Sequence, residues 1–459
     1  MKLRVLATMA LAFLPSIALA SSFYRPSEDA MIEYAEVIAR VRVIEVESAK
    51  EQLGPDTYRI SSKITLQPLQ CLKGCRSDQD AIVIYEPGGT VGDQQAMPVD
   101  APDYAVGTER LVFLSRGPEN TLRTMNSGLG AVPLLPMPNG QLRMQRGVVD
   151  SKPDTYDSFR DRLRKKVGLK AVEKPVKFAA PQLAGDQQQS NTAYRWLGSP
   201  GSKWRANQIS VVLPTVGEKI MGLAEGEKAI LAAFDAWEKA PGASINFEVV
   251  DRQAPQGFVC QQGRLLVSFD DPRGEIDDPQ GCSGVLAIGG FCGSGVTLPD
   301  GFQTINAGAY VSNNGWAGCN FWSAADHRNF DEVSTHELGH AVGLGHSRES
   351  GEQAGPLESD ATMFWMAHFD GRAAGIRDYD RGAIAALYPA AAQPTASPSP
   401  APTASPSPTP EVTASPSPTP EPTSSPSPTA SPGKCGRAAD AGTLFVILGC
   451  ASLMGAARR

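Results

Sequence analysis

The eleven residues HELGHAVGLGH, at positions 336–346, restrict what this chain can fold into more strongly than any other segment. His336 and His340 are four residues apart, so on a helix they project from the same face, one turn apart. Gly343 permits a sharp turn, because glycine adopts positive φ angles without steric cost. That turn brings His346 back as a third ligand. The segment therefore predicts a helix, a glycine turn and a three-histidine metal site at one place in the fold.

The spacing of these histidines predicts a catalytic zinc ion. Three imidazoles leave one position of a tetrahedral ion open, as a catalytic zinc requires for its water. Glu337 directly follows the first ligand, and we expect its carboxylate to act as the general base for that water. The alternative is that these are ordinary histidines on a helix surface. It does not account for three histidines, a glutamate and a glycine in register in a chain with only 5 His.

The segment HELGHAVGLGH matches the extended zinc motif HExxHxxGxxH of the metzincin zinc metallopeptidases at every defined position. Downstream, ESDATMFW resembles the Met-turn of this family, which implies that Met363 lies under the zinc as a hydrophobic floor. Ser347, after the third histidine, resembles the matrixin type, whereas the astacin type carries Glu there. Astacins also have a tyrosine two places after the Met, where this chain has Trp365.

The resemblance to matrixins, including bacterial secreted ones, covers roughly residues 193–388, within a predicted zinc peptidase domain of residues 193–390. It departs from the common pattern in three ways. Only His327 and His368 remain outside the motif, too few for the second, three-histidine structural zinc of vertebrate matrixins. No PRCGxPD sequence precedes the domain, so latency through a zinc-bound cysteine has no matching residue. The insertion between Cys260 and Cys319 is not part of the common pattern.

The resemblance implies a function for the chain: a secreted zinc-dependent endopeptidase, a hydrolase that acts on protein or peptide substrates through activated water. The alternative is a surface binding or adhesion protein whose N-terminal β module does the work and whose peptidase domain is auxiliary. A formal net charge of −7 gives no basic footprint, and we therefore expect no nucleic-acid partner.

The N-terminal part of the chain predicts export and a separate domain. Residues 1–20 combine two basic residues, an apolar run and a small-x-small ending, as in a secretory signal peptide. Residues 21–165 hold β-rich runs broken by Gly, Pro and Asp, which predict a small all-β domain. The polar segment 166–192 is predicted to be a linker. The run RKK at 164–166 is either a basic processing site or a solvated helix face.

The predicted peptidase domain has the pattern of an α+β fold. QISVVLP, INFEVVD and RLLVSFD each predict a strand, and AEGEKAILAAFDAWEKA predicts an amphipathic helix. One face of that helix carries Ile230, Ala233, Phe234 and Trp237. The fold class is therefore α+β: a metzincin-like catalytic domain, with a twisted mixed sheet and an active-site helix, preceded by the small all-β domain.

The cysteines predict disulfides, because an exported chain meets an oxidising compartment. Cys71 and Cys75 are expected to form a small-loop disulfide, with free thiols as the alternative. For the other four the sequence leaves three possible pairings: Cys260, Cys282, Cys292 and Cys319. The same insertion carries four aspartates that can supply oxygen ligands to a calcium ion. A solvated acidic turn is the alternative for these aspartates: Asp270, Asp271, Asp277 and Asp278.

The C-terminal part of the chain predicts attachment to a surface. Residues 391–434 are rich in Pro, Ser and Thr, which favours an extended stalk without a core. Residues 435–459 contain an apolar run that ends in two arginines, at the short limit for a membrane span. This segment resembles bacterial C-terminal tags that are read by a sorting peptidase. We therefore expect the exported protein at the cell surface or outside the cell, in a bacterial envelope, with a buried terminal helix as the alternative for this segment.

Overall fold

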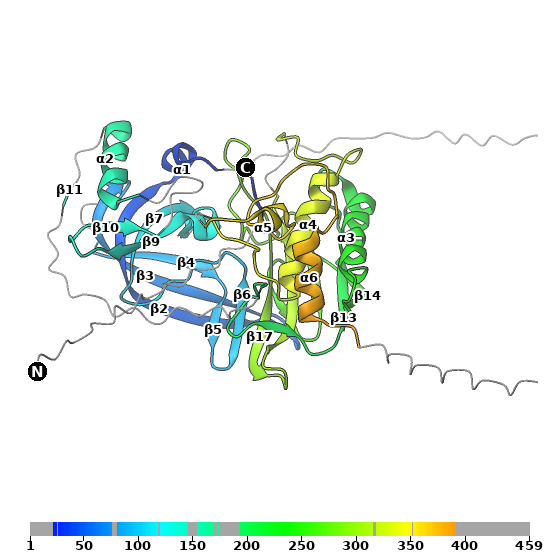
Figure 1. The fold of residues 1–459 in the computed structure, drawn as a ribbon. Coiled ribbons are helices and arrows are strands. Elements are labelled where there is room, and N and C mark those ends of the chain that lie inside the picture. The colour runs from blue at the N-terminus through cyan, green and yellow to red at the C-terminus, as the bar shows by residue number, and fades with distance from the viewer. Residues whose placement is uncertain are drawn as a thin grey trace, which may run out of the picture. The chain divides into compact units, whose positions relative to one another are not determined.

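The fold is seen in a computed structural model, which describes most of the chain between residues 22 and 391 (Figure 1). Residues left undescribed within that span are 25, 76–79, 118–119, 146–153, 169–171, 174–192, 315–317 and 351. The predicted signal peptide, most of the predicted linker, and almost all of the stalk and sorting segment therefore lie outside the described residues. Among the described residues, no helix combines the length and apolar character needed to cross a membrane.

The N-terminal region is built mainly from strands, with two helices and a short 3-10 turn. Its elements are β1 (Ser22–Tyr24), α1 (Glu28–Tyr34), β2 (Val37–Gln52), β3 (Thr57–Lys73), β4 (Ile82–Pro87), β5 (Gly89–Val91), β6 (Gln94–Pro98), β7 (Glu109–Arg116), β8 (Leu122–Thr124), η2 (Ser127–Gly130), β9 (Ala131–Pro136), β10 (Leu142–Met144), α2 (Tyr156–Val167) and β11 (Val172–Glu173).

An antiparallel sheet forms the centre of this region. Its strand order is β10-β9-β7-β2-β3-β11, and β4 and β15 (Cys260–Gln261) pair with β3 while β8 pairs with β7. Side chains along β3 alternate between buried and partly exposed positions, as expected for a strand with one face on a core. Helix α2 packs Phe159 edge-on against Phe113 of β7, with ring centroids 5.9 Å apart. Helix α1 was not predicted from the sequence, because it is only 7 residues long.

The peptidase region contains strands, three long or medium helices and one short helix. Its elements are β12 (Ser202–Trp204), β13 (Gln208–Pro214), α3 (Gly222–Glu238), β14 (Asn246–Gln253), β15 (Cys260–Gln261), β16 (Leu265–Ser268), β17 (Gly284–Thr297), β18 (Gln303–Ser312), α4 (Arg328–Ala341), α5 (Pro356–Asp360) and α6 (Asp378–Leu387).

The sheet of the peptidase region is mixed. In the order β14-β13-β16-β18-β17, the first four strands are parallel and β17 is antiparallel to β18. Helix α3 buries the predicted face, including Phe234 and Trp237, and Trp237 donates its indole N–H to the Thr335 carbonyl of α4 at 3.0 Å. Figure 1 shows α4 beside α3. The predicted α+β fold class is therefore confirmed.

Strands cross between the two regions, which the sequence did not predict. Beyond β17, the peptidase sheet continues into β6 and β5 of the N-terminal region, and β1 also pairs with β17. In return, β15 of the peptidase region pairs with β3 of the N-terminal sheet. The two regions therefore share backbone hydrogen bonds through three strand pairs, β6–β17, β1–β17 and β3–β15. The predicted domain boundaries stay predictions.

The cysteines form three disulfides within the described residues. Cys71 is joined to Cys75, Cys260 to Cys292, and Cys282 to Cys319. The last two bonds select one of the three pairings that the sequence left open. The Cys260–Cys292 bond ties β15 to β17, and so fixes the start of the insertion to the strand next to the active-site helix.

Candidate active site and metal centre

Helix α4 and the turn after it bring the three predicted histidines together. His336 and His340 lie on one face of α4, with ring centroids 4.5 Å apart. The helix ends at Ala341, and Gly343 follows with φ +104°. A Cβ atom at Gly343 would lie 2.0 Å from the Ser202 carbonyl oxygen, so both the φ angle and the close approach require glycine. The chain then turns back and places His346 against the other two rings.

The three histidines point the same nitrogen at one centre. The Nε2 atom of His336 lies 2.8 Å from Nε2 of His340 and 3.1 Å from Nε2 of His346. Ligand nitrogens on a tetrahedral zinc, at about 2.0–2.1 Å from the ion, are separated by roughly 3.3 Å. The three side chains form the one group of potential metal ligands found among the described residues, with ligand atoms within 4.8 Å of one another.

Hydrogen bonds on the far side of each ring decide which nitrogen carries the proton. The Nδ1 atoms of His336 and His340 donate to the carbonyl oxygens of Thr362 and Leu344, at 2.7 and 2.8 Å. Carbonyl oxygens only accept, so the proton of each neutral ring sits on Nδ1 and the lone pair sits on Nε2.

Facing lone pairs repel each other unless a cation lies between them, and a zinc ion fits this donor set. Burial, and then the charges of the neighbouring rings, lower the pKa of His336 and His340 well below the ordinary value. Both rings therefore stay neutral and keep the lone pairs that a metal requires.

Glu349 holds the third ring, and the sequence did not predict this role. Its Oε2 atom lies 3.1 Å from Nδ1 of His346, and the carboxylate is buried with the ring. A carboxylate behind a metal-binding imidazole fixes the ring orientation and raises its basicity. The sequence offered no signal for Glu349 beyond its position three residues after the last ligand, and the chain contains 49 Asp and Glu residues.

Glu337 lies on α4 directly after the first ligand and is 0% exposed. Strand β17 packs against its backbone: a Cβ atom at Gly289 would fall 2.0 Å from the Glu337 carbonyl oxygen. The negative charge of Glu337 also contributes, after burial, to raising the pKa of Tyr310 on the neighbouring strand β18. The structure thus places Glu337 at a buried position of α4, directly after the ligand His336 and with its backbone against β17.

Met363, the residue of the predicted Met-turn, packs against α4. It is fully buried, and its sulfur occupies the space where a Cβ atom at Gly339 would fall, 2.5 Å away. Gly339 precedes the ligand His340, so Met363 packs against the helix between the two histidine ligands. The Met363 carbonyl oxygen accepts a hydrogen bond from Ser347, which follows the third ligand, at 2.7 Å.

A buried carboxylate on α6 holds this turn, and the sequence did not predict it. Asp380 accepts hydrogen bonds from the backbone N–H groups of Thr362, Met363 and Arg377, at 2.7, 3.0 and 2.8 Å. Since the Thr362 carbonyl accepts from the His336 ring, Asp380 acts on the metal site through the turn. The available signal was an aspartate in the first turn of α6, where a carboxylate often caps backbone N–H groups.

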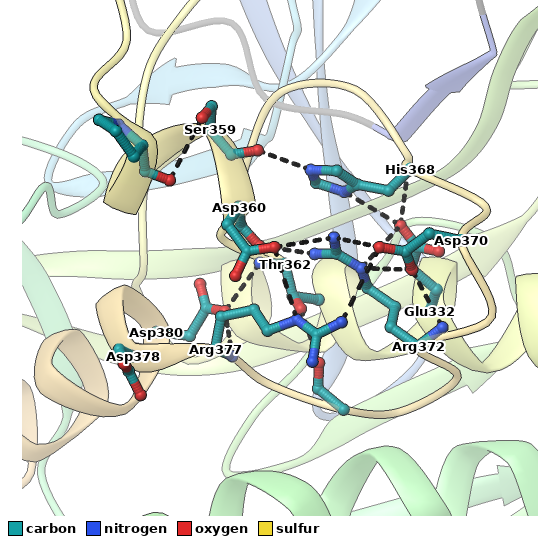
Figure 2. Close-up of polar contacts among 12 residues, drawn as sticks. Glu332, Ser359, Asp360, Thr362, His368, Asp370, Arg372, Arg377, Asp378 and Asp380 are labelled. Atoms are coloured by element: carbon teal, nitrogen blue, oxygen red, sulfur yellow. Dashed lines mark hydrogen bonds and ion pairs between the residues drawn. The ribbon is translucent and has the colours of Figure 1, made fainter.

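Figure 2 shows a second polar network, which holds the segment after Met363 against α4. Glu332 of α4 accepts from the backbone N–H groups of His368 and Phe369, at 2.6 and 3.0 Å. Arg372, buried behind Glu332, pairs with Asp370 at 2.8 Å. These contacts fix the path of residues 368–372. Sequence reasoning missed this network, because its members are spread over some forty residues.

The remaining predicted site residues lie elsewhere. His327 contacts Asp331 of α4 and Glu225 of α3, at 2.7 and 3.1 Å, and His368 belongs to the network of Figure 2. Three of the four aspartates of the insertion accept hydrogen bonds from protein groups at their carboxylates: Asp270 from Lys219, Asp271 from Glu275 and Ile276, and Asp277 from Asn126, Ser115 and Arg123. The backbone carbonyl of Asp278 accepts from the Gln280 amide.

Comparison with known protein families agrees with this geometry. Residues 203–389 match the family model of the matrixins. The matched segment contains the three histidines, Glu337 and Met363, and it supports a matrixin-type metallopeptidase. The chain is therefore a zinc metalloendopeptidase, a hydrolase that acts on proteins or peptides. The alternative of a surface binding protein is not favoured by this match.

Proposed function

We propose that this chain is an exported endopeptidase in which Glu337 is the general base and the three histidines hold the catalytic zinc. The observation that carries the proposal is the convergence of three Nε2 lone pairs beside Glu337, with each Nδ1 engaged by a carbonyl or a carboxylate. When bound, the zinc ion supplies Lewis-acid polarisation of the scissile carbonyl and makes water more acidic.

The residues of the chain have distinct parts in this reaction. His336, His340 and His346 would hold the ion at one position, because a hydrogen bond at each Nδ1 fixes the orientation of its ring. Glu337 takes the proton of the attacking water and passes it to the nitrogen of the leaving amine, so that no covalent bond to the enzyme forms. Burial of Glu337 keeps bulk water from competing for the carboxylate.

The test separates metal binding from catalysis. Glu337→Ala is expected to retain about one zinc per chain by elemental analysis, while cleavage of casein falls by at least about 10²-fold. Asp235→Ala is a matched control, because Asp235 is an exposed acidic residue of α3 that pairs with Lys239 at 2.7 Å and has no assigned part in metal binding or catalysis. Cleavage by Glu337→Ala at the rate of the unaltered protein would contradict the assigned role.

Export and surface attachment belong to the same proposal. The three disulfides of the described residues support an oxidising compartment, and the sequence patterns of residues 1–20 and 435–459 support export and attachment to the cell surface. Mass spectrometry of the cell-surface and secreted fractions tests this: we expect the mature chain to begin after Ala20, and recovery of the intact chain only inside the cell would refute it. The predicted calcium site remains a prediction that metal analysis of the same samples tests.

A further inference from the structure

The outer edge of β17 is the sheet edge nearest to the catalytic residues. One edge of β17 pairs with β18, and the strand packs on α4 at Gly289, where a Cβ atom would fall 2.0 Å from the Glu337 carbonyl oxygen. Peptides often bind a protein by adding a strand to an exposed sheet edge, where main-chain hydrogen bonds supply the affinity. A peptide added to the outer edge of β17 would pass beside Glu337.

Two segments of the N-terminal region already occupy this edge. Strand β6 pairs antiparallel with residues 290–293 of β17, and the N–H of Val99 donates to the Gly289 carbonyl at 2.9 Å. Strand β1 pairs antiparallel with residues 284–287, with Ser22 opposite Ala287. Only Ile288 lies between the two sets of contacts. Both segments run in the same direction, so together they follow β17 as one extended peptide would.

We infer that the N-terminal region, residues 22–145, is an inhibitor of the peptidase domain built into the same chain. Its strands use the main-chain groups of β17 that a substrate strand would use, so the two compete for the same edge. The inference rests on the proposed peptidase function. It assigns the N-terminal region a function of its own and predicts that the chain, with both regions docked, cleaves substrate only at a reduced basal rate.

A buried ion pair anchors the N-terminal region to the insertion of the peptidase domain. Arg123 of β8 lies 2.7 Å from Asp277, and both side chains are only 11% exposed. Asp277 also accepts hydrogen bonds from the Asn126 N–H at 2.6 Å and the Ser115 hydroxyl at 3.0 Å. All the hydrogen bonds found for the Asp277 carboxylate thus come from donors in the N-terminal region.

Apolar contacts join the same surfaces. One hydrophobic cluster contains Met31, Phe113 and Leu129 of the N-terminal region together with Phe258 and Ile276 of the insertion. It also contains Val285 and Ile288 of β17 and Trp365, two residues after Met363. The insertion, which is absent from the common matrixin pattern, therefore supplies much of the surface on which the N-terminal region docks. This gives the insertion a physical purpose.

The test breaks the ion pair in the full-length, zinc-loaded protein. Arg123→Glu places two carboxylates together in a buried site, and removal of one partner of a buried pair is strongly destabilising. We expect the initial rate of casein cleavage to rise at least about tenfold. The double variant Arg123→Glu/Asp277→Arg restores opposite charges and is expected to return a large part of the latency. Arg116→Glu, at an exposed pair with Glu36, is the matched control and should leave the rate unchanged.

A second pair of variants acts on the strand pairing itself. Val99→Pro removes the N–H that donates to Gly289, whereas Val99→Ala keeps it and only shortens the side chain. Activation by Val99→Pro well beyond that of Val99→Ala supports competition for the edge. Equal rates for the unaltered protein, Arg123→Glu and Val99→Pro overturn the inference, because a latent enzyme cannot remain unaffected by loss of its inhibitor.

Hydrogen exchange gives a readout that does not depend on activity. In the unaltered protein, those N–H groups of residues 290–293 that face β6 should be protected, and Arg123→Glu should speed their exchange more than that of the N–H groups of β13 in the sheet interior. Rapid exchange at 290–293 in the unaltered protein would overturn the inference even if no variant cleaved casein. If every variant binds zinc and shows faster amide exchange in β17 but cleaves no casein, the proposed peptidase function is refuted instead. The two failures are therefore distinguishable.

Discussion

Asp380 offers a direct test of how the fold supports the metal site. The side chain is 0% exposed and accepts three backbone N–H groups, from Thr362, Met363 and Arg377. Asp380→Ala leaves all three donors buried without an acceptor. Each such group costs about 1–3 kcal/mol, so the free energy of unfolding should fall by about 3–9 kcal/mol, less whatever a water molecule in the vacated space recovers.

Asp380→Asn should have an intermediate effect. The Asn oxygen can take the place of Oδ2, which accepts from Thr362 and Arg377, but its amide NH₂ then faces the N–H of Met363. One donor is lost instead of three, and the expected cost is about 1–3 kcal/mol. Asp378→Asn is the control on the same helix: its side chain is 84% exposed and pairs only with Arg381 among the ion pairs found, so the expected change is below about 1 kcal/mol.

Two measurements check this series. Urea unfolding at a fixed free zinc concentration gives the loss of stability, because bound metal adds to the apparent stability of the folded state. Competition with a chromophoric chelator gives zinc affinity, which should fall by about 10–100-fold in Asp380→Ala, since the Thr362 carbonyl orients His336. If Asp380→Ala cost no more than Asp378→Asn, the argument that Asp380 holds the turn under the metal would be refuted.

Two further predictions concern other buried carboxylates. Glu349→Gln should weaken zinc binding by about 10–100-fold, because it removes the negative charge behind His346. Glu358 pairs with Arg348 and not with a histidine, so Glu358→Gln is the control and should leave zinc affinity unchanged. Equal zinc affinities of the two variants in chelator titrations would contradict this. Burial raises the pKa of Glu86 to about 7 from 4.5, so the folded state holds its proton where the unfolded state does not. The contribution of Glu86 to the free energy of unfolding should therefore be greatest below about pH 4.5 and fall, by on the order of 3 kcal/mol, as the pH rises to about 7 and beyond. Urea titrations from pH 4.5 to 8 should show a smaller fall in Glu86→Gln, and a profile identical to that of the unaltered protein would rule out this source of pH dependence.

The sequence predicted the local parts of the site, because they depend on spacing within a few residues. A four-residue separation puts His336 and His340 on one helix face whatever surrounds the helix, and a glycine at 343 permits the turn. The buried face of α3 follows from the same periodicity. The supporting residues were not predictable in this way. Asp380 lies 44 residues beyond His336, and the Thr362 carbonyl is a backbone group that no residue type marks.

The arrangement of strands between the two regions was also beyond the sequence. The runs that became β2, β3, β4 and β7 were predicted as strands, because their residues are β-branched or alternate in polarity. Nothing in the short strand β6, however, marks it for pairing with β17 instead of the sheet of its own region. Pairing between strands almost two hundred residues apart depends on the surfaces around them, here the insertion closed by two disulfides.

The shared edge of β17 bears on what controls release of the N-terminal region. Main-chain hydrogen bonds to β6 and Val99 are of the same kind as those a substrate strand would make, so exchanging one for the other changes the backbone contribution little. The balance is therefore decided by contacts that the substrate does not replace. These are the Arg123–Asp277 pair and the apolar cluster around Phe258 and Ile288. Loss of either the ion pair or the apolar cluster should free the edge of β17 without damage to the metal centre. Neither set of contacts takes part in the hydrogen bonds that hold the three histidines and Asp380.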